Sequence, residues 1–271
     1  MIRISLIWVV TIAVVVSIAM HLHTNIEPRM NSIFLDNLPS SREKKSIKVA
    51  LVSDLHVKRT ADAITELETL WSQIIEQKPD IILLAGDYIN DGSSIKGIET
   101  IGPQIAQVFA ASDVLPVVAV LGNHDYWSGG GAWRQYLSDA GVTVLENEIV
   151  ILDGIETCIR GFGDSFTGNF RYVDFPQGCT NKLLISLMHD PAGAFHPNLE
   201  GIVLAGHTHC GQVFIPFLGS IYTPSSAPKD AQCGLFQDEK RVLFVSAGVG
   251  TSVIPFRFNT QSSWDLITIY H

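Results

Sequence analysis

The sequence predicts an α/β fold in which two β-sheets pack face to face between outer helices (α-β-β-α), preceded by a transmembrane helix. Apolar runs of strand length alternate with amphipathic stretches of helix length in the first half, and the second half is richer in strand-like runs. The composition is 46% hydrophobic and 17% charged, which is typical of a chain with a packed core. The 271 residues suffice for one large domain, or at most two small ones.

The N-terminal stretch MIRISLIWVVTIAVVVSIAM carries one charge, on Arg3, and none from residue 4 to residue 20. An uncharged run of this length is at the lower limit for spanning a bilayer. We therefore predict that residues 1–22 form a single-pass anchor in the cell membrane. A cleaved signal peptide, with Ser17-Ile18-Ala19 as a loose cleavage site, and a buried apolar helix remain as alternatives.

The charges around this segment give conflicting signals about its orientation. Arg3 favours a cytoplasmic amino terminus, which would place the following domain outside the cytoplasm. Basic residues after the segment favour the opposite orientation, but all except Arg29 lie more than twenty residues beyond it (Arg42, Lys44, Lys45 and Lys48). We therefore expect the domain on the outer side of the membrane.

The net charge of -9 indicates no basic face, so we expect no nucleic-acid partner. The four cysteines, at positions 158, 179, 210 and 233, form no CxxC motif. Their even number permits disulfides but does not require them.

Residues 23–46 are mixed and polar, and we predict a linker there, followed by a domain at 47–271. The first strand of that domain is KVALVSD at 48–54, a short apolar run. The segment 61–77 repeats apolar residues at helical spacing, with Ile64, Leu67 and Ile74 on one face. DIILLAGD at 80–87 is a second strand, 104–111 a second helix, 116–121 a third strand and 132–140 a third helix.

The second half is predicted to consist mainly of strands. The runs 149–152 and 156–161 flank Asp153-Gly154, a dipeptide typical of hairpin turns. Further strands are predicted at 182–188, 201–205, 242–246 and 265–270.

Polar side chains follow five of these apolar strands, at the point where each strand ends. The stretches are SDLH (Asp54, His56), GD (Asp87), GNHD (Asn123, His124, Asp125), MHD (His189) and GHTH (His207, His209). Ligand sites in α/β sheets gather outside the carboxyl ends of strands, so five such ends can converge on one pocket.

Two aspartates, one asparagine and four histidines in this set could bind metal. Carboxylate, amide and imidazole groups suit Mn, Fe or Zn ions. Seven ligands are too many for one ion but fit two divalent ions that share a carboxylate. Two ions about 3.5–4 Å apart are the usual arrangement for hydrolysing phosphate esters.

Each residue alone also has an ordinary structural explanation. Asp54 could cap a helix, Asp87 could lie in a turn, and His189 could be a core or surface histidine. The pair in GHTH is harder to dismiss, because alternate residues on an extended segment point the same way. The joint pattern, always after an apolar strand, favours the metal site.

The order DxH, GD, GNHD, a single histidine and GHTH resembles that of the calcineurin-like metallophosphoesterases over residues 48–271. The later segments GQVFIP and SAGVGTSVIPFRF look like those of the membrane-associated or exported bacterial phosphodiesterases of the YkuE and YaeI type. Some relatives of that branch remove UMP from UDP-2,3-diacylglucosamine in lipid A biosynthesis.

The resemblance implies a role for each candidate residue. One ion would be held by Asp54, His56, Asp87 and His209, and the other by Asp87, Asn123, His189 and His207. Asp87 would therefore bridge the two ions. His124 would lie near the phosphate and protonate the leaving oxygen or stabilise developing charge, while Asp125 would orient His124.

The chain departs from the resemblance at three points. Cys210 stands where this branch usually has glycine, and we interpret it as a small filler rather than an extra ligand or an oxidation-sensitive thiol. Ser246-Ala247 stands where relatives often carry an arginine, so the resemblance does not support a phosphate contact from that point. The segment 261–265 lacks a proline-glutamate pair.

These features predict a membrane-anchored phosphoesterase in which a hydroxide bridging two ions attacks a phosphodiester or pyrophosphate bond. A membrane anchor favours a lipid-linked substrate such as UDP-2,3-diacylglucosamine. A phosphodiesterase or phosphomonoesterase acting on soluble nucleotides is the alternative, and a non-catalytic scaffold of the same fold is a remote one.

Overall fold

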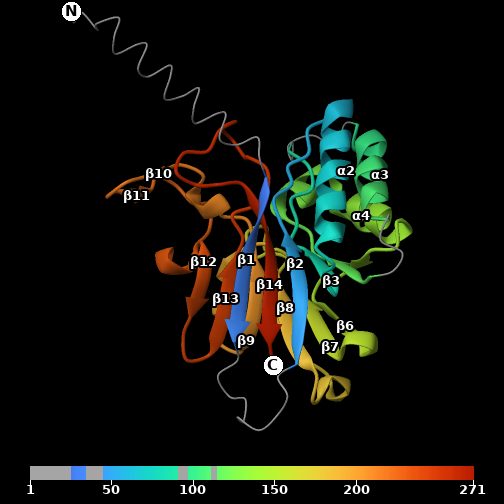
Figure 1. Cartoon of the computed structure of the whole chain (residues 1–271), viewed down its shortest axis with the longest axis vertical. Coiled ribbons are helices and arrows are strands. Elements are labelled where there is room, and N and C mark those ends of the chain that lie inside the picture. The colour runs from blue at the N-terminus through green and yellow to red at the C-terminus, as the bar shows by residue number, and fades with distance from the viewer. Residues whose placement is uncertain (1–25, 35–44, 91–96, 111–114) are drawn as a thin grey trace, which may run out of the picture.

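A computed structural model of the chain describes residues 26–34, 45–90, 97–110 and 115–271. Two six-stranded sheets are formed within these residues (Figure 1). The first has the order β1 (Glu27–Phe34), β14 (Ser263–Tyr270), β2 (Ser46–Val52), β3 (Ile81–Leu84), β4 (Val117–Ala119) and β5 (Thr143–Val144). The second has the order β12 (Gly234–Gln237), β13 (Arg241–Val245), β9 (Gly201–Ala205), β8 (Leu183–Leu187), β7 (Thr157–Gly161) and β6 (Glu148–Leu152).

Both sheets are mixed but have a parallel centre. Strands β2 to β5 are parallel, as are β7, β8, β9 and β13, while β14, β6 and β12 pair antiparallel with a neighbour. A separate small hairpin is formed by β10 (Phe214–Ile215) and β11 (Gly219–Ser220). Parallel strands end at the same edge of a sheet, so the two centres present their carboxyl ends together.

The two sheets pack face to face through a shared apolar layer. In β2, Val49 and Leu51 point into this layer, where they share one cluster with Ile185 and Leu204 of the second sheet. The alternate residues of β2, such as Val52, point to the opposite face. The predicted pair of packed sheets is confirmed.

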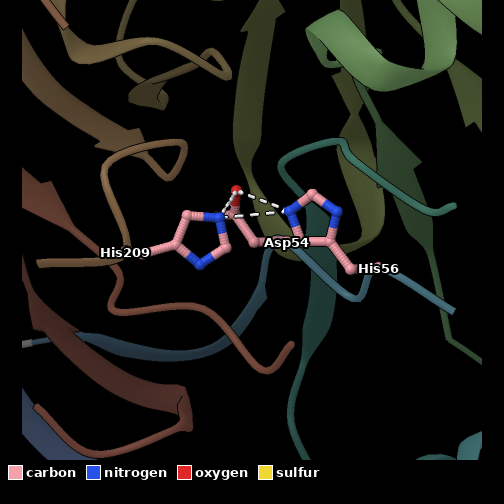
Figure 2. Close-up of side chains that lie close together, drawn as sticks. All are labelled: Asp54, His56 and His209. Atoms are coloured by element: carbon pink, nitrogen blue, oxygen red, sulfur yellow. Dashed lines mark hydrogen bonds and ion pairs between the residues drawn. The ribbon is translucent and has the colours of Figure 1, made fainter. Parts of the chain in front are cut away.

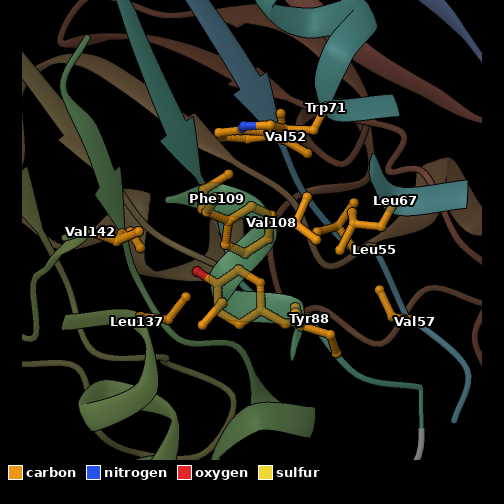
Figure 3. Close-up of a cluster of buried hydrophobic side chains, with 14 of the residues drawn as sticks. Val52, Leu55, Val57, Leu67, Trp71, Tyr88, Val108, Phe109, Leu137 and Val142 are labelled. Atoms are coloured by element: carbon orange, nitrogen blue, oxygen red, sulfur yellow. The ribbon is translucent and has the colours of Figure 1, made fainter. Parts of the chain in front are cut away.

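Among the described residues, three α-helices cover the outer face of the first sheet: α2 (Ala61–Glu76), α3 (Ile98–Phe109) and α4 (Asn123–Asp139). The apolar side of α2 places Trp71 against Phe109 of α3, with ring centroids 5.0 Å apart (Figure 3). Tyr88 and Leu137 extend the same buried cluster towards α4. This layer fixes the loops that follow β2, β3 and β4.

Helix α4 begins nine residues before the predicted 132–140 helix. The prediction missed these first turns because they lack an apolar repeat. Gly122 caps the helix, and its N–H donates to Asp125 at 2.8 Å. Gly129 has a φ of 122°, which kinks the helix after its second turn. The helix therefore starts with the GNHD residues themselves.

The second sheet differs from the predicted α-β-β-α arrangement, because no α-helix of the described residues covers its outer face. Phe162, Met188 and Leu243 pack there against Phe195 of the 3-10 turn η3 (Pro191–Phe195) and against the loop residue Phe170. The remaining 3-10 turns are η1 (Asp153–Ile155), η2 (Gln177–Cys179), η4 (His209–Gly211) and η5 (Lys229–Ala231). The connections of this half have no helical apolar repeat, so loops form the outer layer.

The predicted linker at 23–46 is wrong for residues 27–34, which form the edge strand β1 beside β14. Ile33 is buried in the layer between the sheets, and Arg29 forms an ion pair with buried Asp265, with Nε 2.7 Å from Oδ1. Pro28 lacks an N–H, which is tolerated on an edge strand. The pairing partner lies more than two hundred residues away, so local sequence does not reveal it.

The predicted anchor, residues 1–22, lies outside the described residues. Among the residues that the structure does describe, no helix combines the length and the apolar character needed to cross a bilayer.

Candidate metal centre

The candidate ligands lie together at the carboxyl edge of the two sheets. Each follows a strand: Asp54 and His56 after β2, Asp87 after β3, Asn123 after β4, His189 after β8, and His207 and His209 after β9. All seven side chains predicted from the strand ends are buried there.

Asp54, His56 and His209 form one ligand group (Figure 2). Nε2 of His56 lies 3.1 Å from Nε2 of His209, and Nε2 of His209 lies 3.4 Å from Oδ1 of Asp54. Within the described part of the chain, this Oδ1 atom is buried without a hydrogen-bond partner. A buried, unpartnered carboxylate oxygen facing two imidazole nitrogens fits a cation, which would satisfy all three atoms.

Asp87, His189 and His207 form a second group, next to Asn123. Nε2 of His189 lies 3.3 Å from Oδ2 of Asp87, 3.1 Å from Oδ1 of Asn123 and 3.1 Å from Nδ1 of His207. The other nitrogen of His189, Nδ1, lies 2.6 Å from the carbonyl oxygen of Ala85. That carbonyl can only accept, so it fixes a hydrogen on Nδ1 and leaves Nε2 for a metal.

The two groups meet at Asp87. Its Oδ2 atom lies 3.6 Å from Nε2 of His56 in the first group and 3.3 Å from Nε2 of His189 in the second. Its Oδ1 atom accepts the backbone N–H of His124 at 2.9 Å. Asp87 therefore occupies the place between the groups that a bridging carboxylate needs.

Burial keeps three of the histidines uncharged at neutral pH. It lowers the pKa of His56 to about 4 and that of His209 to about 3, although nearby Asp54 and Asp87 act in the opposite direction. Burial also lowers the pKa of His207, and the neighbouring His189 lowers it further. Metal binding needs neutral imidazole, so these side chains already have the charge state that a metal ligand requires.

His189 and Asp87 behave as a charged pair in the absence of cations. Burial alone would lower the pKa of His189, but Asp87 outweighs it and raises that pKa well above the usual value. Burial alone would raise the pKa of Asp87, but His189 and His56 outweigh it and lower that pKa. A divalent cation would compete with the proton held between them.

The backbone at the ligands is strained. Asp54, His56, Asp87, His207 and His209 all have φ between 45° and 70°, in the left-handed region that non-glycine residues rarely adopt. Such strain persists only where the surrounding structure holds it, and it gathers at functional sites. The strand ends are therefore shaped to aim ligands, at a cost to local stability.

Two glycines allow the first-half loops to approach each other. A Cβ on Gly122 would lie 2.3 Å from Oδ1 of Asp87 and 2.8 Å from Cε1 of His189. Gly86 has a φ of 87°, and a Cβ there would lie 2.4 Å from the N atom of Gly122. The glycines of GD and GNHD are thus required by close packing around the ligands.

Asp125 has different partners from the predicted one. Its Oδ2 atom accepts the backbone N–H groups of Asp87 and Gly122, both at 2.8 Å, and its Oδ1 atom accepts that of Tyr88 at 2.9 Å. The carboxylate thus points back into the loop that carries Asp87 and away from the ring of His124. Asp125 therefore positions the backbone of Asp87.

His124 lies at the start of α4 and faces the cavity at the metal centre. Its Nδ1 atom is 3.1 Å from the carbonyl oxygen of Asn90, and its Nε2 atom is 3.4 Å from Oγ of Ser252. Its ring packs edge-on against that of His56, with centroids 4.7 Å apart. His124 is therefore adjacent to the ligands, as expected, but is oriented by Asn90 and Ser252.

Sequence reasoning missed Arg257, whose guanidinium is buried beside His209. Its Nη1 atom donates to the carbonyl oxygen of His209 at 3.2 Å, and its Nη2 atom lies 3.1 Å from Nδ1 of the same residue. It also missed Ser53, whose Oγ donates to Oδ2 of Asp54 at 2.5 Å. Ser53 belongs to the stretch SDLH and Arg257 to the segment SAGVGTSVIPFRF, so both lie within motifs that the sequence analysis identified without assigning these two residues a role.

The interpretation of Cys210 as a filler is wrong, because Cys210 is bonded to Cys233. A second disulfide joins Cys158 to Cys179. Ser246-Ala247 is another departure from the resemblance. Ser246 is buried and its Oγ donates to Oδ2 of Asp265 at 2.6 Å, so its side chain points into the fold and not towards a ligand.

A cavity of about 470 Å³ opens over the ligands. Asp87, Asn123, His207 and His209 form part of its floor. Its walls include large apolar side chains, among them Trp127, Phe166, Tyr222 and Ile254. The site therefore combines a polar metal-binding floor with apolar walls.

Comparison with known proteins agrees with this geometry. Residues 47–211 match the family model described as calcineurin-like phosphoesterase. The chain is 29% identical over 234 residues to "Uncharacterized metallophosphoesterase YkuE" of Bacillus subtilis, covering 82% of this chain and 78% of that protein. It is 28% identical over 226 residues to "Phosphodiesterase YaeI" of Escherichia coli, covering 79% and 78% of the two chains.

A "Transmembrane protein with metallophosphoesterase domain" from Danio rerio is 26% identical over 254 residues, covering 84% of this chain and 54% of the relative. This chain thus spans about half the length of that protein. The match to the family model covers more than half of the chain and ends just beyond His209, the last candidate ligand. The chain therefore belongs to the calcineurin-like phosphoesterases, hydrolases that use divalent metals to cleave ester bonds.

Proposed function

We propose that this chain is a two-metal phosphodiesterase that hydrolyses a phosphodiester or pyrophosphate bond. The observation that carries the proposal is the position of Asp87 between two adjoining ligand groups, 3.6 Å from His56 and 3.3 Å from His189. Such an arrangement suits two cations sharing one carboxylate.

The donor atoms fit the proposed metals. All are carboxylate or amide oxygens and imidazole nitrogens, a set that suits Mn, Fe or Zn ions. The first ion would be held by Asp54, His56, Asp87 and His209, and the second by Asp87, Asn123, His189 and His207. When bound, the two ions would supply a hydroxide nucleophile at neutral pH and polarise the phosphoryl oxygens.

His124 would exchange a proton with the leaving oxygen through Nε2. The carbonyl of Asn90 can only accept a hydrogen bond, so the Nδ1 atom of His124, 3.1 Å away, carries a hydrogen. This leaves Nε2, on the side of Ser252, as the nitrogen that holds or releases a proton at the cavity. Ser252 keeps the ring in this orientation.

We further propose a lipid-linked substrate, for which UDP-2,3-diacylglucosamine is one candidate, and a chain anchored by residues 1–22 with its domain outside the cytoplasm. The apolar cavity walls support a substrate with an apolar part. The two disulfides support an oxidising compartment, where such bonds persist.

The test is hydrolysis of bis-p-nitrophenyl phosphate by the full chain, with bound metal counted by mass spectrometry. We expect two ions per chain, loss of turnover after chelation and its recovery with Mn²⁺. Turnover that survives complete removal of metal would contradict the proposal, and so would a metal-loaded chain without turnover, which would indicate a scaffold. A panel of UDP-2,3-diacylglucosamine, glycerophosphodiesters, cyclic nucleotides and phosphomonoesters then separates lipid-linked from soluble substrates.

A further inference from the structure

We propose that the rim of the catalytic cavity docks on a lipid bilayer, so that the metal centre meets phosphodiesters at the membrane surface. This inference rests on the proposed function of the site. The docking surface, here called the apolar rim, consists of the β10–β11 hairpin with the residues after it and the loop before Arg257. Its exposed apolar residues include Phe217, Leu218, Ile221, Tyr222, Val253 and Ile254.

The apolar rim exposes side chains that are normally buried. Val253 is 98% exposed and Leu218 is 81% exposed, and Phe217 at the tip of the hairpin is fully exposed. Water contact with so many neighbouring apolar side chains is unfavourable, and such patches usually mark a binding surface. Phe217 and Leu218 lie at the tip of the hairpin and outside the cavity lining, so they suit insertion into a soft apolar phase.

The segments that form the apolar rim are free of charge. No Asp, Glu, Lys or Arg occurs from residue 212 to residue 228 or from residue 242 to residue 256. Charged groups resist transfer into a bilayer, so their absence from both segments removes the main cost of insertion. The same absence predicts docking on a zwitterionic surface, without the anionic lipids that a basic patch would need.

The two loops of the rim are tied to each other and to a metal ligand. Nε2 of Gln212 donates to the carbonyl oxygens of Ile254 and Phe256, at 2.8 Å and 3.1 Å. Arg257, directly after the second loop, donates to the carbonyl oxygen of His209 at 3.2 Å. The rim therefore lies at a fixed place relative to the metal centre, and docking would also place that centre.

The point where the chain enters the fold indicates which apolar partner the rim meets. Strand β1 starts at Glu27, opposite Ser263 of β14, and the N–H of Ser263 donates to the carbonyl of Gly248, which packs against Asp54. The start of β1 thus lies at the metal-centre edge, the same end of the molecule as β10 and β11 (Figure 1). The uncharged run of residues 4–20 precedes this point, so a membrane held by that run would face the rim.

The rim is continuous with the cavity. Ile221, Tyr222, Val253 and Ile254 belong to both, and Phe166 on the opposite wall packs against the ring of the ligand His207, with centroids 4.9 Å apart. An acyl chain could follow these side chains from the bilayer to the ligands. The substrate class is therefore a phosphodiester or pyrophosphate attached to a lipid.

The test places a tryptophan at the tip of the hairpin. The full chain with Phe217→Trp is reconstituted in vesicles of phosphatidylcholine with brominated acyl chains, and its fluorescence is compared with that of the parent chain. The matched control is Ile151→Trp, because Ile151 is an exposed apolar residue on β6 that pairs with Cys158 near the amino end of β7, at the opposite edge of the sheet. We expect the added fluorescence to be quenched at position 217, in low and high salt alike, and not at position 151.

Equal quenching by the brominated lipid at positions 217 and 151 would overturn docking, and so would quenching at position 217 that requires anionic lipid. A second control measures the fluorescence of the tryptophan at position 217 in detergent, without vesicles. If that fluorescence shows burial that increases with the concentration of the chain, the partner is a second copy of the chain, and bilayer docking is overturned.

A second variant, Phe217→Ser with Leu218→Ser, separates docking from chemistry. Neither residue lines the cavity, so turnover of bis-p-nitrophenyl phosphate should be unchanged. Turnover of a lipid phosphodiester in phosphatidylcholine vesicles should fall about tenfold, because two inserting side chains are lost. An equal effect on both substrates would overturn docking. Absence of all hydrolysis in the parent chain, with position 217 still quenched, would instead contradict the proposed function and leave docking intact.

Discussion

Two halves of the domain supply the candidate metal ligands, and they hold these residues in different ways. The half built from β2 to α4 carries Asp54, His56 and Asp87 on loops and Asn123 at the start of α4, all fixed by regular helices packed on a sheet. The half built from β7 to β13 carries His189, His207 and His209 on strands whose outer face is covered by loops and 3-10 turns. Both disulfides lie in this second half, whose outer face carries no α-helix within the part of the chain that the structure describes.

We infer from this difference that the Cys210–Cys233 bond has, beside His209, the role that helical packing has in the first half. In the first half, Asp125 collects three backbone N–H groups beneath Asp87, and apolar packing supports them. In the second half, the Cys210–Cys233 bond adjoins His209, and Arg257 holds the carbonyl of that residue. A hydrogen bond joins the two halves: the backbone N–H of His207 donates to Oδ2 of Asp54 at 2.9 Å.

The largest expected effect comes from Asp87, where the two halves meet. Asp87→Asn should lower turnover of bis-p-nitrophenyl phosphate by more than about 100-fold, because losing a bridging ligand costs more than losing an outer-shell partner. Metal counting should show both ions lost, whereas His56→Asn should retain the ion of the second group. Asp139→Asn, on the exposed end of α4, is the control. Two ions retained in Asp87→Asn would break the bridging assignment.

The second effect isolates chemistry from metal binding in the first half. His124→Ala should lower kcat by about 10²–10⁴, the usual contribution of a general acid, while both ions stay bound. Steady-state kinetics and metal counting on the same sample measure the two quantities. His196→Ala serves as the control, since His196 belongs to neither ligand group. An unchanged kcat would refute a role for His124 in proton transfer.

The third effect compares the two disulfides of the second half. Their partners are 21 and 23 residues apart, so removal of either pair by alanine should lower the free energy of unfolding by about 3 kcal/mol. Denaturant titration measures this loss. Only removal of Cys210 and Cys233 should also weaken Mn²⁺ binding, because Cys210 follows His209. Equal Mn²⁺ affinity in both variants would show that the bond does not hold the ligand.

The smallest effect concerns protonation in the metal-free chain. The pKa of His56 falls from 6.5 to about 4 on folding, mainly through burial, so the unfolded state binds the proton first as the pH falls. This stabilising contribution is present above pH 6.5 and is lost as the pH falls towards 4, with about 2 kcal/mol lost at pH 5. Denaturation in EDTA should show a shallower pH dependence for His56→Asn than for the parent chain. Parallel curves would contradict the burial of a neutral imidazole.

The sequence determined which residues are candidate ligands. Each follows an apolar run that reads as a strand, and strand ends in α/β sheets converge, so Asp54, Asp87 and His207 could be assigned to one site without coordinates. The helix at 61–77 and most strands were also correct, because their periodicity is local. Helix α4 was missed at its start, since Gly122 and Asp125 cap it without any apolar repeat.

Only the tertiary structure decided the partners of those residues. The pairing of β1 with β14, the bond between Cys210 and Cys233, the contact of Arg257 with His209 and the hydrogen bonds of Asp125 all depend on how distant segments meet. The local sequence pattern indicates which secondary structure a residue favours, whereas these contacts depend on the order of the strands in the two sheets. The sequence by itself therefore named the chemistry of the site, and the packing of the two halves determined its geometry.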